Sequence, residues 1–402
     1  MAEYPLARDD GPAMMMVISF DGVSALAIIT LGIWCYLFFL RGGFWWIGAS
    51  HSDEKQTNDV ENWTSVVAIV PARNEAETIG RSVASLARQN YPGDFRVVVV
   101  DDHSDDDTAR VAQLAAVENE VVNQVTILTA DAQPAGWTGK LWALNKGVAS
   151  AQKDAPEFYW FTDADVQHSP GTLRGLVACA QRNDLDIASL MVMLQATTLP
   201  ERLLIPPFLY FFLLLYPPRW IANAKKRTAG AAGGCILLRH SGLGRIGGLA
   251  AKRSEVIDDC ALARAVKRSG GRIWMGLTRS SVSVRSYSSF SEIRDMIART
   301  AFTQLHYSAP LLSAALAGIF LTYLTPLLLL ISPSHGTRVL ATLMMFISFL
   351  PTVRFYRLLP FWTLLLPVAA IFYGYATWLS AVRYWVGRGG QWKGRAQAPR
   401  KS

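Results

Sequence analysis

Cysteine is scarce in this sequence, and the spacing of the cysteines is not that of a zinc site or a disulfide framework. The four cysteines, Cys35, Cys179, Cys235 and Cys260, are scattered over 402 residues. No Cys-x-x-Cys pair and no Cys/His pattern is present, so neither a zinc site nor a disulfide framework is indicated. This composition fits a reducing compartment for the middle of the chain.

Histidine and, at the C-terminal end, acidic residues are also in short supply. Of the six histidines, His103, His168 and His306 lack the spacing of metal ligands, and we expect each to be structural. Residues 383–402 contain lysine and arginine but no acid, which favours attraction to anionic lipid. No basic stripe interleaved with aromatic residues occurs elsewhere, so nucleic acid is not expected as a partner.

Long apolar runs, in contrast, are abundant, and the chain is 51% hydrophobic. Residues 14–40 are apolar apart from Asp21, and Arg41, Trp45 and Trp46 follow as an interfacial flank. A secretory signal is the alternative, but the leading segment is not basic and no small-x-small cleavage site follows. We therefore predict an uncleaved transmembrane anchor over 14–47. The acids before it and Arg41 after it favour a cytosolic middle domain.

The C-terminal part holds three more apolar stretches, at 309–332, 339–353 and 361–382. They predict a transmembrane region over 309–384, followed by a basic tail over 385–402. Four spans in all would place this tail outside, against the charge rule, whereas a middle stretch that only dips into the membrane returns it to the cytosol. Residues 203–216 are aromatic and contain Pro206 and Pro207, which favours a membrane-surface helix or a hydrophobic channel wall.

Between these regions, residues 64–305 alternate between apolar runs and helical periodicity. This alternation predicts an α/β domain with a mainly parallel, Rossmann-like sheet. We expect strands at 66–70, 96–100, 125–128, 158–162, 187–194, 235–238, 273–277 and 281–287. We expect the main helices at 75–89, 141–151, 170–182, 258–269 and 290–304, and another that ends near residue 117.

Carboxylates follow several of the predicted strands. The apolar run that begins at Phe158 ends in Asp163 and Asp165, which would share one face of an extended backbone. Ligands of open α/β sheets bind at the carboxyl ends of strands. Two hard oxygen donors at such a place suit a divalent cation, Mg or Mn, that also binds a diphosphate. The alternative for these two acids is a solvated turn.

Other candidate residues lie near neighbouring strand ends. Glu75 and Asp102 suit the base and ribose of a nucleoside, and Lys140, in a glycine-rich loop, suits a phosphate. Asp259 could take a proton from an acceptor hydroxyl. Structural alternatives stay open, because Asp258 and Asp259 could simply be acids at a helix N-terminus and Lys140 a surface lysine.

Four segments, taken in order, resemble the motifs of family 2 glycosyltransferases with the GT-A fold. They are Pro-Ala-Arg-Asn-Glu at 71–75, the acidic run at 101–108, Thr-Asp-Ala-Asp at 162–165 and Ile-Asp-Asp at 257–259. The resemblance covers about residues 65–300. The N-terminal anchor, the segment 136–145 and the segment 298–305 are similar to the hopene-associated glycosyltransferase subgroup of hopanoid-producing bacteria.

This resemblance implies a UDP-sugar donor, Mg or Mn, and inversion at the sugar carbon in one displacement. Asp163 and Asp165 would serve the metal and the diphosphate, and Asp259 would be the catalytic base. The candidate nucleotide-sugar site comprises Pro71, Arg73, Glu75, Asp102, Ser104, Lys140, Asp163, Gly233, Gly234 and Arg299.

The sequence departs from the family pattern at two places. Asp258 stands where the family has glutamate, so the choice of base between Asp258 and Asp259 stays open. Processive members carry Gln-x-x-Arg-Trp, but here 296–300 keeps only Arg299, which could also be an interfacial residue. The missing tryptophan argues against a polysaccharide synthase and for a single transfer.

The hypothesis is a multi-pass, metal-dependent glycosyltransferase of the bacterial inner membrane, with its catalytic domain in the cytosol. It would transfer one sugar from a nucleotide-diphosphate sugar to a lipid hydroxyl, with a hopanoid as the candidate acceptor. One alternative is transfer to a polyprenyl phosphate, which needs no strong base. A second alternative is a non-catalytic membrane scaffold with a degenerate nucleotide-binding domain, which the retained carboxylates disfavour.

Overall fold

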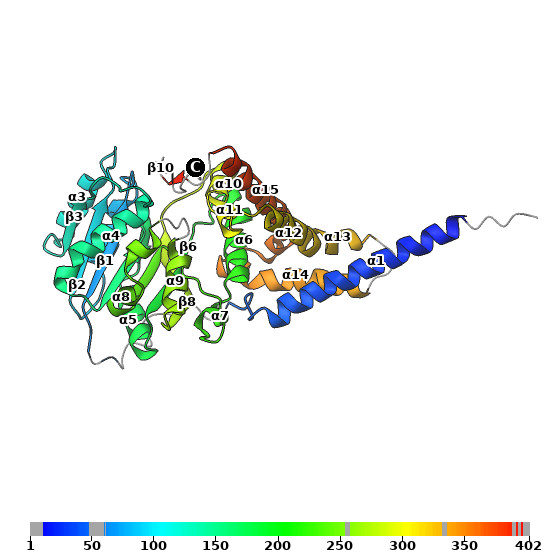
Figure 1. Cartoon of the computed structure of the whole chain (residues 1–402), viewed down its shortest axis with the longest axis horizontal. Helices are drawn as coiled ribbons and strands as arrows, with labels where there is room; N and C mark the ends of the chain where they lie inside the picture. Colours follow the sequence, from blue (N-terminus) through cyan, green and yellow to red (C-terminus); the bar gives the residue numbers. More distant parts are fainter. Residues whose placement is uncertain are drawn as a thin grey trace, which may run out of the picture.

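The computed structural model describes residues 11–47, 60, 62–253, 258–331 and 336–387, with two short strands at 391–392 and 395–396. Most of the predicted basic tail lies outside the described residues, and so does the side chain of Asp258. Figure 1 shows an elongated molecule with a sheet domain at one end and a helical region at the other.

The sheet domain is built on eight strands in the order β3-β2-β1-β4-β7-β6-β8-β5. Their bounds are β1 Val66–Ala72, β2 Phe95–Asp101, β3 Val125–Thr129, β4 Phe158–Thr162, β5 Val166–His168, β6 Ile187–Met193, β7 Cys235–Arg239 and β8 Ile273–Ser283. The pairs β1–β2, β1–β4, β2–β3 and β6–β8 are parallel, and β7 runs antiparallel to both of its neighbours, β4 and β6.

Strand β1 shows why the apolar runs form a sheet with two covered faces. All of its residues are buried, and alternate side chains belong to different cores. Val66, Ala68 and Val70 pack with helices α2 (Ile79–Ala87), α3 (Thr108–Glu118) and α5 (Thr172–Arg182), whereas Val67 and Ile69 pack with α4 (Gly139–Ala151). Because side chains alternate along a strand, a continuous apolar run places hydrophobic residues on both faces.

The structure corrects several predicted features of this domain. Six of the eight strands described run in the same direction, as predicted for a mainly parallel sheet, but β7 and β5 run opposite to them, so the sheet is mixed. The two strands expected at 273–277 and 281–287 form one strand, β8, with a bulge opposite Met191 and Met193. The helix expected at 290–304 is divided into α10 (Phe290–Ala298) and α11 (Ala301–Gln304).

Helix α5 also begins later than predicted, at Thr172, so Pro170 precedes the helix instead of lying in its first turn. The backbone around Pro170 is held by the end of α2. Asn90 donates its backbone N–H to the Pro170 carbonyl at 2.7 Å, and the Gln89 side chain accepts from the Leu173 N–H at 3.0 Å. These hydrogen bonds to residues 89 and 90 set the start of α5, and the sequence around Pro170 does not contain this information.

The helical region contains α1 (Gly11–Cys35), α6 (Leu199–Leu215), α7 (Pro218–Ala222), α12 (Ala309–Ile319), α13 (Thr325–Leu329), α14 (Gly336–Phe355) and α15 (Leu366–Trp385). In the part of the chain that the structure describes, five helical segments are long and apolar enough to cross a membrane: Gly22–Leu40, Leu199–Ala222, Ala309–Leu329, Arg338–Phe355 and Pro360–Trp385. Two π-helical turns, η1 (Tyr36–Leu40) and η4 (Phe320–Leu324), extend α1 and connect α12 to α13.

Figure 1 shows that α1 and α14 run together along the long axis, whereas α6 lies at the boundary with the sheet domain and runs across them. Helix α6 continues through Pro206 and Pro207, and a capping box formed by Thr198 and Glu201 closes its first turn. The remaining elements are α8 (His240–Arg245), α9 (Asp258–Arg268), the 3-10 turns η2 (Gln152–Asp154), η3 (Leu249–Lys252) and η5 (Pro360–Leu365), and the pair β9 (Gln391–Trp392) and β10 (Arg395–Ala396).

Candidate functional site

A cavity of about 2080 Å³ lies between the sheet domain and the helical region. Its lining comes from the ends of β1 and β4, from the loop before β7, and from α6, α10, α12 and α15. The predicted site residues that line it are Pro71, Glu75, Lys140, Asp163, Asp165, Gly233, Gly234, Asp259 and Arg299. The structure therefore gathers carboxylates that are far apart in the sequence around one space.

Lys140 and Asp163 meet at the edge of the sheet. Asp163 directly follows β4, and Lys140 is the second residue of α4, in the turn that carries the positive end of the helix dipole. The Lys140 Nζ lies 2.7 Å from Asp163 Oδ1, and the two side chains are 19% and 34% exposed. The lysine is thus placed where the positive end of a helix and a cation act together on an anion.

Arg285 connects two further carboxylates of the cavity, and sequence reasoning did not single it out. Its Nη2 donates to both carboxylate oxygens of Glu75, at 2.7 and 2.9 Å, and its Nε donates to Asp165 Oδ2 at 3.0 Å. Burial disfavours the charged guanidinium, but the Glu75 and Asp165 carboxylates outweigh burial, so the pKa of Arg285 is raised above its usual value. Arg285 therefore stays a cation at every physiological pH.

Asp259 is oriented by the backbone on both sides of its carboxylate. Gly233 donates its N–H to Asp259 Oδ2 at 3.0 Å, and Cys260 donates its N–H to Oδ1 at 2.7 Å. A Cβ added at Gly233 would come within 3.2 Å of Asp259 Oδ2 and 3.5 Å of Lys140 Nζ. The glycine loop before β7 thus brings a backbone donor against the acid, in a place with little room for a side chain.

Three predicted nucleoside residues lie beside the cavity but do not line it. Asp102 is fully buried, and its backbone carbonyl accepts from Arg73 Nη1, which also donates to the His103 carbonyl at 2.8 Å. Ser104 donates to the Asp101 carboxylate and accepts from the Asn74 N–H at 3.0 Å. Arg73, Asp102 and Ser104 therefore hold the loops after β1 and β2 together, and the cavity is lined instead by Asn74, Glu75 and Asp106.

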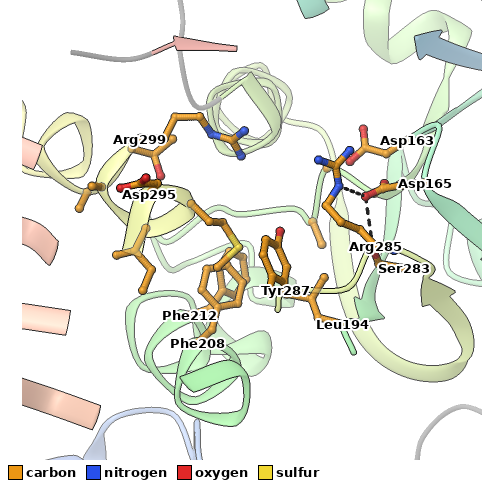
Figure 2. Close-up of a pocket in the computed structure, with 18 of the residues that line it drawn as sticks. Asp163, Asp165, Leu194, Phe208, Phe212, Ser283, Arg285, Tyr287, Asp295 and Arg299 are labelled. Atoms are coloured by element: carbon orange, nitrogen blue, oxygen red, sulfur yellow. Dashed lines mark hydrogen bonds and ion pairs between the residues drawn. The ribbon is translucent and has the colours of Figure 1, made fainter. Parts of the chain in front are cut away.

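The opposite end of the cavity is apolar and aromatic. Phe208, Phe211 and Phe212 of α6 line it together with Tyr323 and Tyr373 from the membrane-type helices. Figure 2 shows Tyr287, Phe208 and Phe212 between two guanidinium groups, Arg285 on the side of Asp163 and Asp165 and Arg299 on the side of Asp295. One continuous space thus joins a charged end and a hydrocarbon-like end.

Arg299 lies on this helical side, at the break between α10 and α11. Asp295, its neighbour in Figure 2, is instead paired with Arg383 of α15 at 2.7 Å and with Arg294 at 2.9 Å. Within the described residues, Arg299 forms no ion pair of its own with a carboxylate at 4 Å or less. Its position suits an anion that approaches from the helical side.

A divalent cation fits the donor chemistry of this site when two carboxylates of the chain and the oxygens of a phosphate share its coordination. The described residues contain no group of three or more His, Cys, Asp or Glu side chains that could hold a metal ion by themselves. Asp163 and Asp165 both line the cavity, and two carboxylates completed by phosphate oxygens are a common arrangement for Mg²⁺. These two aspartates would hold the ion, and Lys140 and Arg285 are the cations that pair with them in this structure.

Part of the chain matches a known protein family. Residues 67–247 match the family model Glycosyl transferase family 2. The matched range contains every predicted site residue from Pro71 to Gly234. Asp259, Arg285 and Arg299 lie beyond it, so their assignment depends on the geometry of the cavity.

Two curated relatives are 4,4'-diaponeurosporenoate glycosyltransferases of Staphylococcus aureus, from strains bovine RF122 / ET3-1 and USA300. They are 39% identical over 106 residues and 37% identical over 105 residues, which is 26% of this chain and 25% of each relative. The match thus spans about a quarter of the length of these relatives. A mannosyltransferase from Pyrobaculum calidifontis, solved in complex with GDP-Man and Mn2+, shares the fold over 91% of this chain and 99% of its own, with a TM-score of 0.54 and 17% identity.

Proposed function

We propose that this protein is a membrane-bound glycosyltransferase that transfers one sugar from a nucleotide-diphosphate sugar to a lipid acceptor. The observation that carries the proposal is the single cavity that joins a charged sheet edge to an aromatic wall of α6, η4 and α15. A water-soluble donor suits the first end and a hydrocarbon chain suits the second. The match to a glycosyltransferase family model over the first half of the site supports the donor.

In this proposal each residue has a role that its contacts permit. Pro71 and Glu75 border the nucleoside, and Arg73, Asp102 and Ser104 hold the loops that shape its pocket. Lys140 lies against the diphosphate, beside Asp163. A divalent cation, Mg or Mn, would neutralise the charge of the departing diphosphate when bound.

Asp259 is proposed as the base for a hydroxyl acceptor. Its carboxylate, fixed by the N–H groups of Gly233 and Cys260, accepts the proton of the acceptor hydroxyl as the acceptor oxygen attacks the anomeric carbon. The bond from that carbon to the diphosphate oxygen breaks in the same displacement, and the configuration inverts. Asp259 is proposed on its contacts with Gly233 and Cys260, and the side chain of Asp258 lies outside the described residues.

The donor is proposed to be a UDP-sugar and the acceptor a hopanoid hydroxyl, as the family resemblance implies. We further propose that the domain over 64–305 faces the cytosol from a bacterial inner membrane. Support comes from Arg41, which follows the first apolar helix, and from the five helical segments able to cross a membrane.

A second candidate acceptor is a lipid with an acidic head group, such as a polyprenyl phosphate. The observation that favours it is Arg299, which reaches the cavity from the helical side. The S. aureus relatives, named for diaponeurosporenoate, are consistent with an acidic acceptor. Such an acceptor is already an anion and needs no strong base.

The test is incorporation of labelled sugar into extracted lipid by the purified full-length protein. We expect Asp163→Ala to reduce transfer at least about a hundredfold for either acceptor class, because the diphosphate loses a ligand of its counter-ion. Asp259→Asn should reduce transfer about 10²–10⁴-fold for a hydroxyl acceptor but leave transfer to a phosphate or carboxylate largely intact. Full activity of both variants would refute the assignment of the site.

A further inference from the structure

Three carboxylates at the donor end of the cavity are already paired with cations of the chain itself. Asp163 pairs with Lys140 at 2.7 Å, and Arg285 pairs with Glu75 at 2.7 Å and with Asp165 at 3.0 Å. These five side chains together carry one net negative charge. A bare divalent cation would therefore enter a site in which its two proposed ligands each have a positive neighbour.

Arg285 is held in this place by more than its own side chain. Val284 donates its N–H to the Asp165 carbonyl at 2.7 Å, and Ser283 donates its hydroxyl to Asp165 Oδ2 at 3.3 Å. The segment after β8 and the segment after β4 are thus tied together, with the guanidinium between Asp165 and Glu75 (Figure 2). The Arg285 side chain is only 34% exposed, and the side chains of Glu75 and Asp165 are 12% and 17% exposed.

We propose that Arg285 competes with the divalent cation for Asp165, so that metal binds tightly only together with a nucleotide diphosphate. This inference rests on the proposed donor site. In the empty site, Arg285 supplies the positive charge that Asp165 needs. When a diphosphate enters, its negative charges accommodate both the metal and the guanidinium, and Arg285 then becomes a ligand of the diphosphate as well. Arg285 is therefore a positioning residue that makes metal and nucleotide binding cooperative.

Electrostatics sets the direction of this effect. A guanidinium about 3 Å from a ligand oxygen repels a doubly charged ion bound at the same carboxylate, and the low exposure of the group limits screening. Removing the charge leaves Glu75 and Asp165 as two neighbouring carboxylates without their shared counter-ion, which favours binding of a cation. Linkage requires that metal raise nucleotide affinity by the same factor as nucleotide raises metal affinity.

The experiment measures Mn²⁺ binding by electron paramagnetic resonance of free Mn²⁺, with the full chain in nanodiscs, alone and with saturating UDP or GDP. For the unmodified protein we expect at least a tenfold tighter Kd for Mn²⁺ when the preferred nucleotide is present. Arg285→Gln should bind Mn²⁺ alone about tenfold more tightly and should lose most of the gain from nucleotide. Arg285→Lys keeps the charge and should bind Mn²⁺ alone as weakly as the unmodified protein, within about threefold.

Arg279→Gln is the matched control. Arg279 lies on the same strand β8 but donates to the backbone carbonyls of Phe355 and Arg354, so its loss changes the net charge equally without touching the site. The inference is overturned if Arg285→Gln changes the Kd for Mn²⁺ alone less than twofold, or if Arg285→Lys behaves like Arg285→Gln. Should Arg285→Gln fail to fold, equal Mn²⁺ affinity with and without nucleotide in the unmodified protein overturns it.

These results are separable from the proposed function. Sugar transfer to lipid combined with unchanged Mn²⁺ binding in Arg285→Gln would reject the competition and leave the glycosyltransferase assignment standing. Cooperative binding of Mn²⁺ and nucleotide without transfer to any lipid would support the competition and reject the proposed acceptor.

Discussion

At the scale of single residues, His168 illustrates how burial fixes the charge of a side chain inside the sheet domain. It is 4% exposed, and its two ring nitrogens lie 2.8 Å from Thr162 Oγ1 and 2.9 Å from Ser281 Oγ. Burial lowers its pKa from 6.5 to about 3. The imidazole is therefore neutral in the folded protein, and it supports Thr162, the residue directly before Asp163. The structural role expected for this histidine is consistent with these contacts.

This depressed pKa predicts the pH dependence of stability. The unfolded chain takes up a proton at His168 below pH 6.5, whereas the folded protein resists protonation until about pH 3. The free energy of unfolding therefore does not depend on the protonation of His168 above pH 6.5. Between pH 6.5 and about pH 3, protonation of His168 in the unfolded chain lowers it by about 1.4 kcal/mol per pH unit. Thermal unfolding of His168→Gln should show a shallower loss of Tm between pH 7 and pH 5.

The control for this measurement is His103→Gln, since His103 is exposed on a loop. That variant should keep the slope of the unmodified protein. Identical slopes for His168→Gln and the unmodified protein would show that acid sensitivity arises elsewhere.

Individual site residues differed in how well the sequence could predict them. Asp163, Asp165, Lys140 and Asp259 follow apolar runs or begin helices, so their place at a sheet edge could be predicted, and all four line the cavity. Arg285 could not be predicted, because an arginine after a polar strand end looks like any surface residue. Its role arises from contacts with Glu75 and Asp165, which lie 210 and 120 positions away.

At the scale of elements, the start of α6 is the junction between the cavity wall and the sheet domain. Glu201 is fully buried and accepts five hydrogen bonds. Its Oε2 accepts from the N–H groups of Thr197 and Thr198 and from the Thr197 hydroxyl, and its Oε1 accepts from the Tyr287 N–H and the Ser286 hydroxyl. One carboxylate therefore fixes α6 to the segment that carries Arg285.

Glu201→Gln should destabilise the protein by on the order of 2 kcal/mol, because the amide NH₂ cannot accept and would face buried donors. Glu292 provides a comparison, since it occupies the equivalent position at the start of α10 but is exposed. Glu292→Gln should leave the midpoint of thermal unfolding nearly unchanged. Equal effects of the two substitutions would contradict the role given to burial.

The elements themselves were largely predictable, but their directions and junctions were not. The runs around β1, β2 and β4 and the periodicity of α2 and α4 gave their positions to within a few residues. The antiparallel course of β7 left no local signal, because an apolar strand after a glycine loop reads the same in either direction. The break at Arg299 between α10 and α11 is similarly set by the packing of both helices on α15, for example by the Ser380 hydroxyl that accepts from the Phe302 N–H at 3.0 Å.

At the scale of the whole molecule, the contacts of the helical region place the C-terminal ends of α14 and α15 near the sheet domain. Figure 1 shows α13 ending, and α14 beginning, far from the sheet. Helix α14 then returns, and the Phe355 carbonyl accepts from Arg279 of β8 at 2.9 Å. Arg383, near the end of α15, pairs with Asp295 of the cavity wall. We therefore predict that the chain leaves α15 on the side of the sheet domain.

This arrangement can be tested by labelling single cysteines with a membrane-impermeant maleimide, after Cys35 and Cys179 are replaced by serine. Val386→Cys and Val122→Cys, at positions 62% and 46% exposed, should react in inside-out vesicles. Ile331→Cys, at a position 88% exposed beyond α13, should react only from the opposite side. Reaction of positions 331 and 386 from one side would reject the predicted topology.

The cavity between the sheet domain and the membrane-type helices has a consequence for turnover in the proposed reaction. Its two ends release products into different phases: the spent nucleotide dilutes into water, whereas the glycosylated lipid stays in the two-dimensional bilayer. Dilution with buffer lowers the concentration of the spent nucleotide, so it relieves inhibition by the nucleotide but not by the glycosylated lipid. Inhibition by the second should follow its mole fraction in the vesicle, so added plain phospholipid, rather than buffer, should restore the rate.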